Sequence, residues 1–117
     1  MIISNEIKSE KVYENEDILA FKDVNPVAPV HILIIPKIKN GLTGISKANE
    51  NHVEILGKLL LGVKVVADKL KIEDGYRVVI NEGENGCQTV KHIHIHLIGG
   101  KQLGWPPGVE GNIKAKF

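Results

Sequence analysis

One run of seven residues near the C-terminal end constrains this 117-residue chain more than any other feature. It reads His92-Ile93-His94-Ile95-His96-Leu97-Ile98, so that histidines alternate with aliphatic residues. Successive side chains of a β-strand point to opposite faces of its sheet. The alternation therefore predicts a strand with three histidines on one face and the hydrophobic core behind the other. At about 3.3 Å of rise per residue, neighbouring histidines would lie roughly 6 to 7 Å apart, within reach of one ligand.

The remaining pattern predicts the elements that surround this strand. Strands are expected over residues 12–13, 18–21, 31–35, 76–80 and 90–98. From residue 46 onward, apolar residues recur every three or four positions, which predicts one long helix. Its core face would consist of Val53, Leu56, Leu60, Val63, Ala67 and Leu70. Together these elements predict an α+β domain with an antiparallel sheet that carries the helix.

Two further expectations concern residues of this helix and its start. Glycines at Gly57 and Gly62 are unfavourable inside a helix, so we expect close packing against the sheet to compensate for them. His52 lies outside the histidine run, and we expect it to be a solvated helix residue.

Composition limits the class of protein. The length suits a single domain, 1–117, and 15 basic against 14 acidic residues leave no broad surface charge for nucleic acid or an anionic membrane. A single cysteine excludes an internal disulfide, and no stretch approaches the roughly 20 apolar residues of a membrane span or the apolar run of a signal peptide. We therefore expect a cytoplasmic protein without nucleic-acid or membrane partners.

The histidine run alone leaves three interpretations open: an ordinary exposed strand face, a metal site, and a phosphate site. Histidines at alternate strand positions can ligate zinc, but no carboxylate lies near the run in the sequence. Glycines nearby permit close backbone approach to a ligand, and short polar side chains add neutral hydrogen-bonding groups. These residues are Gly83, Gly86, Gly99, Gly100, Asn81, Gln88 and Thr89. The combination favours a phosphate.

The histidine run resembles the signature of the histidine triad (HIT) family. Three longer segments are similar to the Hint branch of that family: LAFKDVNPVAPVHILIIPK, GYRVVINEG and GCQTVKHIHIHLIGGKQLGWPPG. The resemblance implies a five-stranded antiparallel sheet with one long helix and a short one, paired as a homodimer. It also implies a phosphoramidase that hydrolyses adenosine or guanosine 5′-phosphoramidates through a nucleotidyl-histidine intermediate, binds purine nucleoside monophosphates and needs no cofactor.

The same resemblance implies roles for individual residues. His94 would be the nucleophile, held by the backbone carbonyl of His92, while His96 would share the phosphate and assist the leaving amine, and His31 would complete the group. Asp23 would bind the ribose hydroxyls. The base pocket and the phosphate contacts would come from Phe21, Val24, Asn81, the Cys87 backbone, Gln88 and Thr89.

Some features depart from the family pattern. Cys87 stands where relatives usually have glycine, and Lys91 stands where an aromatic residue is common. The chain lacks the N-terminal cysteine pair that binds zinc in many bacterial relatives, so we predict no metal. For the homodimer we expect Leu59 and Val66 to form a second apolar helix face. No function is assigned to the tail, 109–117.

Four alternatives remain to the predicted activity. A dinucleoside polyphosphate hydrolase would use the same histidines on a longer substrate, and a metal-dependent enzyme would lose activity with a chelator. A nucleotide-binding scaffold protein would bind adenosine monophosphate without turnover. An ordinary exposed strand face would do none of these.

Overall fold

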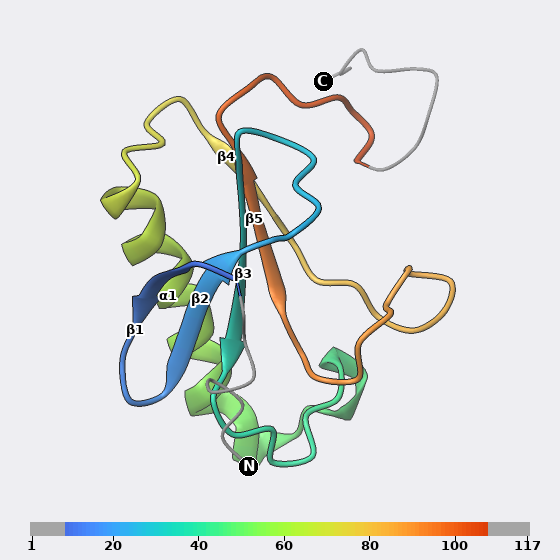
Figure 1. Ribbon diagram of the computed structural model, residues 1–117. Coiled ribbons are helices and arrows are strands. Elements are labelled where there is room, and N and C mark those ends of the chain that lie inside the picture. The colour runs from blue at the N-terminus through green and yellow to red at the C-terminus, as the bar shows by residue number, and fades with distance from the viewer. Residues whose placement is uncertain (1–8, 108–117) are drawn as a thin grey trace.

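The computed structural model describes residues 9–107, which form an antiparallel sheet with a helix packed across one face (Figure 1). The predicted tail, 109–117, lies outside the described residues. The elements are β1 (Lys11–Glu14), β2 (Ile18–Lys22), β3 (Val30–Pro36), two 3-10 helices (Ile45–Lys47 and Glu50–His52), α1 (Val53–Lys69), β4 (Tyr76–Val79) and β5 (Ile95–Gly99). The strands lie in the order β1-β2-β3-β5-β4, and every neighbouring pair is antiparallel. The predicted α+β class and the five-stranded antiparallel sheet are therefore confirmed.

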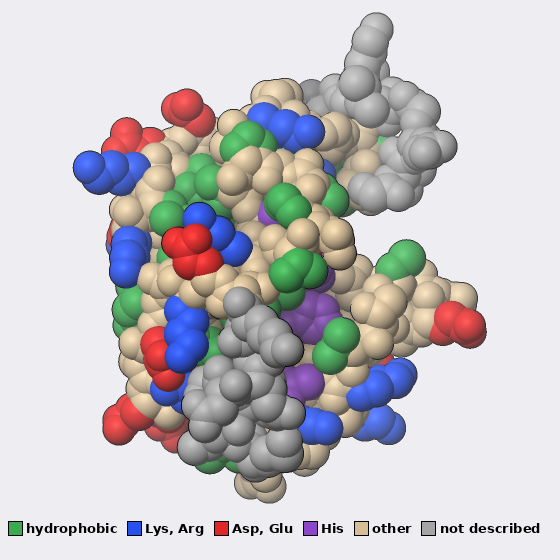
Figure 2. Space-filling model, viewed as in Figure 1, with side chains coloured by type: hydrophobic (Ala, Val, Ile, Leu, Met, Phe, Trp, Pro, Cys, Tyr) green, Lys and Arg blue, Asp and Glu red, His purple; other side chains and the backbone are tan. Residues whose placement is uncertain are grey.

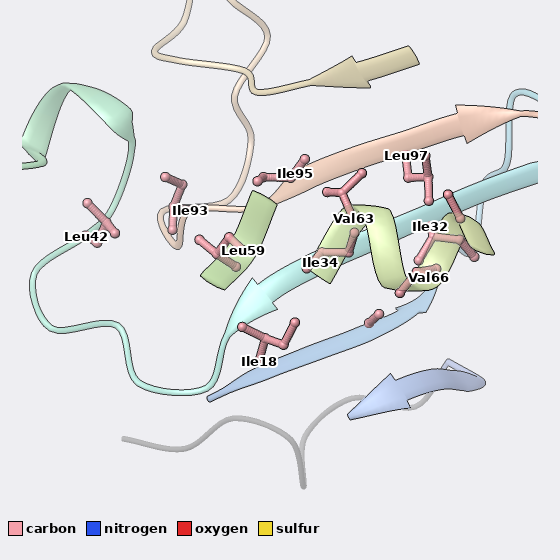
Figure 3. Close-up of a cluster of buried hydrophobic side chains, with 12 residues drawn as sticks. Ile18, Ile32, Ile34, Leu42, Leu59, Val63, Val66, Ile93, Ile95 and Leu97 are labelled. Atoms are coloured by element: carbon pink, nitrogen blue, oxygen red, sulfur yellow. The ribbon is translucent and has the colours of Figure 1, made fainter. Parts of the chain in front are cut away.

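The main core lies between α1 and the sheet (Figure 3). Ile93, Ile95 and Leu97 are almost completely buried in it, as the alternation predicts. Because side chains alternate along β5, burying these three residues turns His96 to the opposite face of the sheet. The burial of Ile95 and Leu97 thus fixes the direction of His96.

The predicted core face of α1 is partly right: Val63 and Ala67 are buried and Leu56 and Leu70 pack against the core, but Val53 and Leu60 are exposed. Leu59 and Val66 are fully buried, with Val63 and Ala67 beside them, whereas Leu60 is 55% exposed. Leu59 and Val66 therefore belong to the core and cannot form the second apolar face that we expected for a dimer. Leu59, Leu60 and Leu61 are consecutive, so the apolar pattern does not show which of them faces the core. Packing against the sheet decides this. No helix within residues 9–107 has both the length and the apolar character of a membrane span.

The two glycines of α1 differ in how closely neighbouring residues pack against them. A Cβ at Gly62 would clash with Cδ1 of Ile18, so this glycine lets the helix approach β2, as expected. Gly57 has open space around its Cα, and the expectation of close packing there is wrong.

β5 begins later than predicted, at Ile95, and residues 90–94 are not a strand. Pro36 ends β3, so this segment has no neighbouring strand to pair with. Instead, the N–H of Ile93 donates to the carbonyl of Leu42, and Nε2 of His92 donates to the carbonyl of Pro36, 2.9 Å away. His92 is consequently buried away from the rings of the other two histidines.

His52 is also buried, with only 5% of its surface exposed, and the expectation that it is solvated is wrong. Its Nδ1 accepts from the N–H of Asn49, and its Nε2 donates to the carbonyl of Asn40 at 3.0 Å. His52 therefore joins the start of α1 to the turn after β3.

Candidate functional site

The site lies on the face of the sheet opposite α1. Phe21 of β2 pairs with Leu33 of β3, which pairs with His96 of β5, so three neighbouring strands present these side chains in one row. Leu19, Phe21 and Ile35 form a small second core on this face. Histidine side chains gather on the floor of a hollow beside a projecting loop (Figure 2). The loop between β4 and β5 extends from the sheet here (Figure 1).

His31, His96 and Asp23 meet at the centre of the site. Nε2 of His31 lies 2.9 Å from Nδ1 of His96 and 3.4 Å from Oδ2 of Asp23. The backbone holds two of these groups, because the N–H of Val27 donates to Nδ1 of His31 and the N–H of Asn25 donates to Oδ1 of Asp23. The structure therefore places His31 next to His96 of the histidine run.

His94 lies beside this group and has a partner of its own. Its ring centroid is 5.1 Å from that of His96, and its Nδ1 donates to the carbonyl of His92 over 2.9 Å. Among residues 9–107, Nε2 of His94 and Nε2 of His96 make no hydrogen bond, which leaves both atoms available to a ligand. His92 thus contributes its carbonyl to this group, whereas its ring lies elsewhere.

Burial affects the charge of two histidines, His96 and His92. Desolvation, with smaller contributions from His94 and His31, lowers the pKa of His96 to about 4, so the ring is neutral near pH 7. Burial also lowers the pKa of His92, although the hydrogen bond to Pro36 partly opposes it. A neutral imidazole has one N–H donor and one lone pair, and the hydrogen-bond partners decide which nitrogen has which.

The loop 81–88 is tied to itself and to its neighbours. Nδ2 of Asn81 donates to the carbonyl of Gly86. The amide of Gln88 accepts from the N–H of Gly83 and donates to the carbonyls of Thr43 and Val90. A phosphate contact by Gln88 would have to replace one of these bonds.

Glu82 is a residue that sequence reasoning missed. Its carboxylate accepts from both the N–H and the hydroxyl of Ser46, at 2.9 and 2.8 Å, and these bonds lower its pKa. A Cβ at Gly44 would clash with this carboxylate, and one at Gly86 would clash with the Glu82 backbone. The two glycines thus allow Glu82 to hold the loop against residues 44–46, a contact between distant segments that the sequence pattern does not signal.

The remaining predicted residues lie around the edge of the site. Cys87 is exposed and has a φ of 66°, a left-handed conformation that suits the glycine expected there better than a cysteine. Its N–H donates to the carbonyl of Glu84. Thr89 is exposed, and Val24 is 75% exposed next to Asp23, so both are free to contact a ligand.

Asp23 forms a group of possible metal ligands with His31 and His96. The sequence shows no carboxylate near the histidine run, yet Asp23, His31 and His96 each offer a ligand atom, and these atoms lie within 4.8 Å of one another. The fold brings Asp23 there because it follows β2 directly while His31 lies at the start of β3, which runs antiparallel beside it. The N–H of Asp23 also donates to the carbonyl of His31.

Known proteins share both the sequence and the fold. The family model described as HIT domain matches residues 4–103. A "14 kDa zinc-binding protein" of Zea mays is 64% identical over 92% of this chain and 84% of its own, and "Adenylylsulfatase HINT1" of Arabidopsis thaliana is 57% identical over 92% and 73%. The crystal structure of a HIT family hydrolase from Legionella pneumophila Philadelphia 1 superimposes with a TM-score of 0.85 at 44% identity, covering 92% of this chain and 95% of that one. The chain belongs to the HIT domain family, in its Hint-like branch.

Proposed function

We propose that this chain is a nucleotide hydrolase that breaks the P–N bond of adenosine and guanosine 5′-phosphoramidates by covalent catalysis at His94. The strongest support is the hydrogen bond between Nδ1 of His94 and the carbonyl of His92. A carbonyl can only accept, so Nδ1 carries a proton, and in the neutral ring Nε2 keeps the lone pair. The neutral form of His94 therefore directs a nucleophilic nitrogen into the site.

The nucleotide would lie along the face that carries Phe21, His31 and His96. Asp23 would accept hydrogen bonds from the ribose hydroxyls, since Oδ1 and Oδ2 are held at the end of β2 by the contacts to Asn25 and His31. Phe21 and Val24 would contact the base, one buried and one exposed beside Asp23. Backbone and side chains of the loop 81–89 would contact the phosphate.

The reaction would proceed in two displacements. First, Nε2 of His94 forms a bond to the α-phosphorus, and the P–N bond breaks with both electrons on the departing nitrogen, which accepts a hydrogen bond from Nε2–H of His96 and takes its proton from solvent. A water molecule then attacks the phosphorus of the nucleotidyl-His94 intermediate and releases one proton to solvent. The nucleoside monophosphate leaves, and His94 regains its lone pair. The products are the amine and the monophosphate, and both rings end as they began.

A direct assay tests this activity. Purified protein is incubated with adenosine 5′-phosphoramidate, and adenosine monophosphate is followed by chromatography. We expect multiple turnovers, with slower release from a diadenosine polyphosphate. Binding of adenosine monophosphate without any turnover would instead favour a nucleotide-binding scaffold protein.

Adenylyl sulfate is a second candidate substrate, because the relative from Arabidopsis thaliana with 57% identity is named an adenylylsulfatase. The same attack by His94 would then break a P–O bond, and sulfate would leave without needing a proton. Turnover of the two adenosine substrates by one preparation decides between them. A phosphoramidase shows the higher kcat/KM on the phosphoramidate.

We also propose that the chain forms a homodimer through β4 and neighbouring apolar residues. β4 lies at one edge of the sheet and pairs only with β5 within the described part of the chain. Tyr76 and Val78 of β4 are exposed, as are Leu60 and Leu61 of α1. A second copy related by a two-fold axis would pair with this edge and cover such residues on both partners.

A further inference from the structure

The two histidines of the site that face a ligand are held in opposite tautomers. We propose that His31 is a positioning residue that fixes His96 as an N–H donor at Nε2, so that His96 cannot act as a second nucleophile beside His94. The tautomers themselves depend only on the hydrogen bonds of the protein. The consequence for catalysis rests on the proposed function.

The backbone N–H of Val27 determines which nitrogen of His31 carries the proton. The N–H of Val27 lies 3.2 Å from Nδ1 of His31 and can only donate. Nδ1 of His31 therefore has the lone pair, and its ring proton lies on Nε2. That proton is directed at Nδ1 of His96, 2.9 Å away, which must accept it. The neutral ring of His96 then carries its own proton on Nε2.

Asp23 reinforces the same arrangement. Its Oδ2 lies 3.4 Å from Nε2 of His31, and a carboxylate can only accept, so it favours a proton on that nitrogen. Its Oδ1 is already held by the N–H of Asn25 at 2.8 Å, which prevents the carboxylate from turning away. Moving the proton of His31 to Nδ1 would turn a lone pair of Nε2 toward the Asp23 carboxylate and set two N–H groups against each other at Val27.

This tautomer also bears on metal binding. A neutral histidine binds a metal through a lone pair while its other nitrogen carries a proton that needs an acceptor. In the group Asp23, His31 and His96, the His31 nitrogen that faces the other two is protonated, and its other nitrogen faces a donor. The spacing of the three ligand atoms would suit a metal, but their protonation does not. We therefore expect no zinc at this group, although a relative is named a zinc-binding protein.

Nitrogen-15 NMR of the imidazole rings in the resting protein at neutral pH measures the tautomers directly. His52 and His92 donate from Nε2 to backbone carbonyls, so they should share the Nε2–H form with His31 and His96. His94 alone should show the Nδ1–H form. An Nδ1–H signal from His96 in the wild-type protein would overturn the proposal.

Two variants of equal size test whether the hydrogen-bond donor at position 31, rather than the shape of its side chain, sets the tautomer of His96. In His31→Gln the amide can still donate to Nδ1 of His96, whereas in His31→Glu the carboxylate can only accept. We expect His31→Gln to keep the His96 tautomer and a kcat within a few-fold of wild type. His31→Glu should place a proton on Nδ1 of His96 and lower kcat by ~10-fold or more, with KM changed less. Equal tautomers and equal kcat in the two variants would contradict the proposal.

A second pair of variants leaves every histidine in place and serves if His31→Glu does not fold. Val27→Pro removes the N–H that His31 accepts, and Val27→Ala keeps it. Only Val27→Pro should mix the tautomers of His31 and His96 and reduce kcat. Identical spectra and kcat in both variants would overturn the proposal.

Isothermal titration calorimetry with zinc should give the same heat for the wild type and for His31→Gln. A zinc site that the wild type has and His31→Gln lacks would also overturn the proposal.

These outcomes separate two kinds of failure. The expected tautomers in a wild-type protein that turns over no phosphoramidate would refute the proposed function and leave the role of His31 intact. Turnover with a different tautomer pattern would refute the role of His31 alone.

Discussion

His94 and His96 hydrogen-bond through the same ring atom in opposite directions. Nδ1 of His94 donates to the carbonyl of His92, whereas Nδ1 of His96 accepts from Nε2 of His31, and both bonds are 2.9 Å long. Two identical side chains, two positions apart, therefore present different groups to the same space. A lone pair at His94 suits attack on phosphorus, and an N–H at His96 suits a phosphoryl oxygen or a leaving nitrogen.

Loss of His96 should depend on the leaving group. For His96→Ala we expect turnover of a basic-amine phosphoramidate to fall by about 10²- to 10⁴-fold, because the departing nitrogen needs a proton. An aryl ester whose phenolate leaves unprotonated should lose much less. His96→Gln, which keeps an N–H donor, serves as the control for hydrogen bonding alone. Equal losses on both substrates would argue against assistance to the departing nitrogen by His96.

Asp23 is expected to contribute to ribose binding. Asp23→Ala should weaken adenosine monophosphate binding by about 1.5 to 3 kcal/mol, the usual value for hydrogen bonds to a charged group. Isothermal titration calorimetry measures this loss, and Asp17→Ala, which removes a carboxylate paired with Lys58, is the matched control. Wild-type affinity in Asp23→Ala would remove Asp23 from the binding site.

Stability should fall between about pH 6.5 and pH 4. An unfolded histidine titrates near 6.5, whereas burial lowers the pKa of folded His96 to about 4 and also lowers that of His92. Between these values the unfolded chain binds more protons than the folded one, so the stabilisation is complete above 6.5 and is lost as the pH falls. Urea unfolding of the wild type should lose roughly 1 to 3 kcal/mol more across this range than His96→Gln. The same loss in both proteins would contradict the pKa of His96.

The dimer proposal is tested at β4. Val78→Glu places a charge on the exposed edge strand and should shift the protein toward the monomer in sedimentation at micromolar concentration. Ile38→Glu, at a position after β3 that is more exposed than Val78 (57% against 40%), should leave the dimer intact. A wild-type species of only 12.9 kDa would exclude the dimer at that concentration.

Local patterns predicted much of the fold. The alternation of histidine with aliphatic residues predicted the burial of Ile93, Ile95 and Leu97. The short apolar runs predicted all five strands. Periodicity failed where it was ambiguous, as in the three leucines at the centre of α1. It also failed for His52, because the burial of that ring depends on Asn40, which comes near it only in the folded chain.

The histidines of the site were predictable as a group, but their protonation was not. The tautomer of His96 depends on His31, which in turn depends on the N–H of Val27. None of these contacts is local to the histidine run, since β3 and the loop before it supply them. The same reason explains Asp23, whose carboxylate lies far from the run in the sequence and next to it in the fold.

The central claim is that His94 forms a bond to phosphorus. His94→Asn leaves the Ile93 and Ile95 side of the core unchanged, so the variant should fold and bind adenosine monophosphate. Its turnover should fall by several orders of magnitude, because residual catalysis can come only from binding and electrostatics.

Rapid quenching followed by peptide mass spectrometry tests that bond most directly. With a phosphoramidate in excess, the wild-type protein should carry one adenylyl group on the peptide that contains His94, and His94→Asn should carry none. A wild-type protein that never shows this adduct when its hydrolysis is slow, or a His94→Asn variant that retains wild-type turnover, would contradict covalent catalysis at His94.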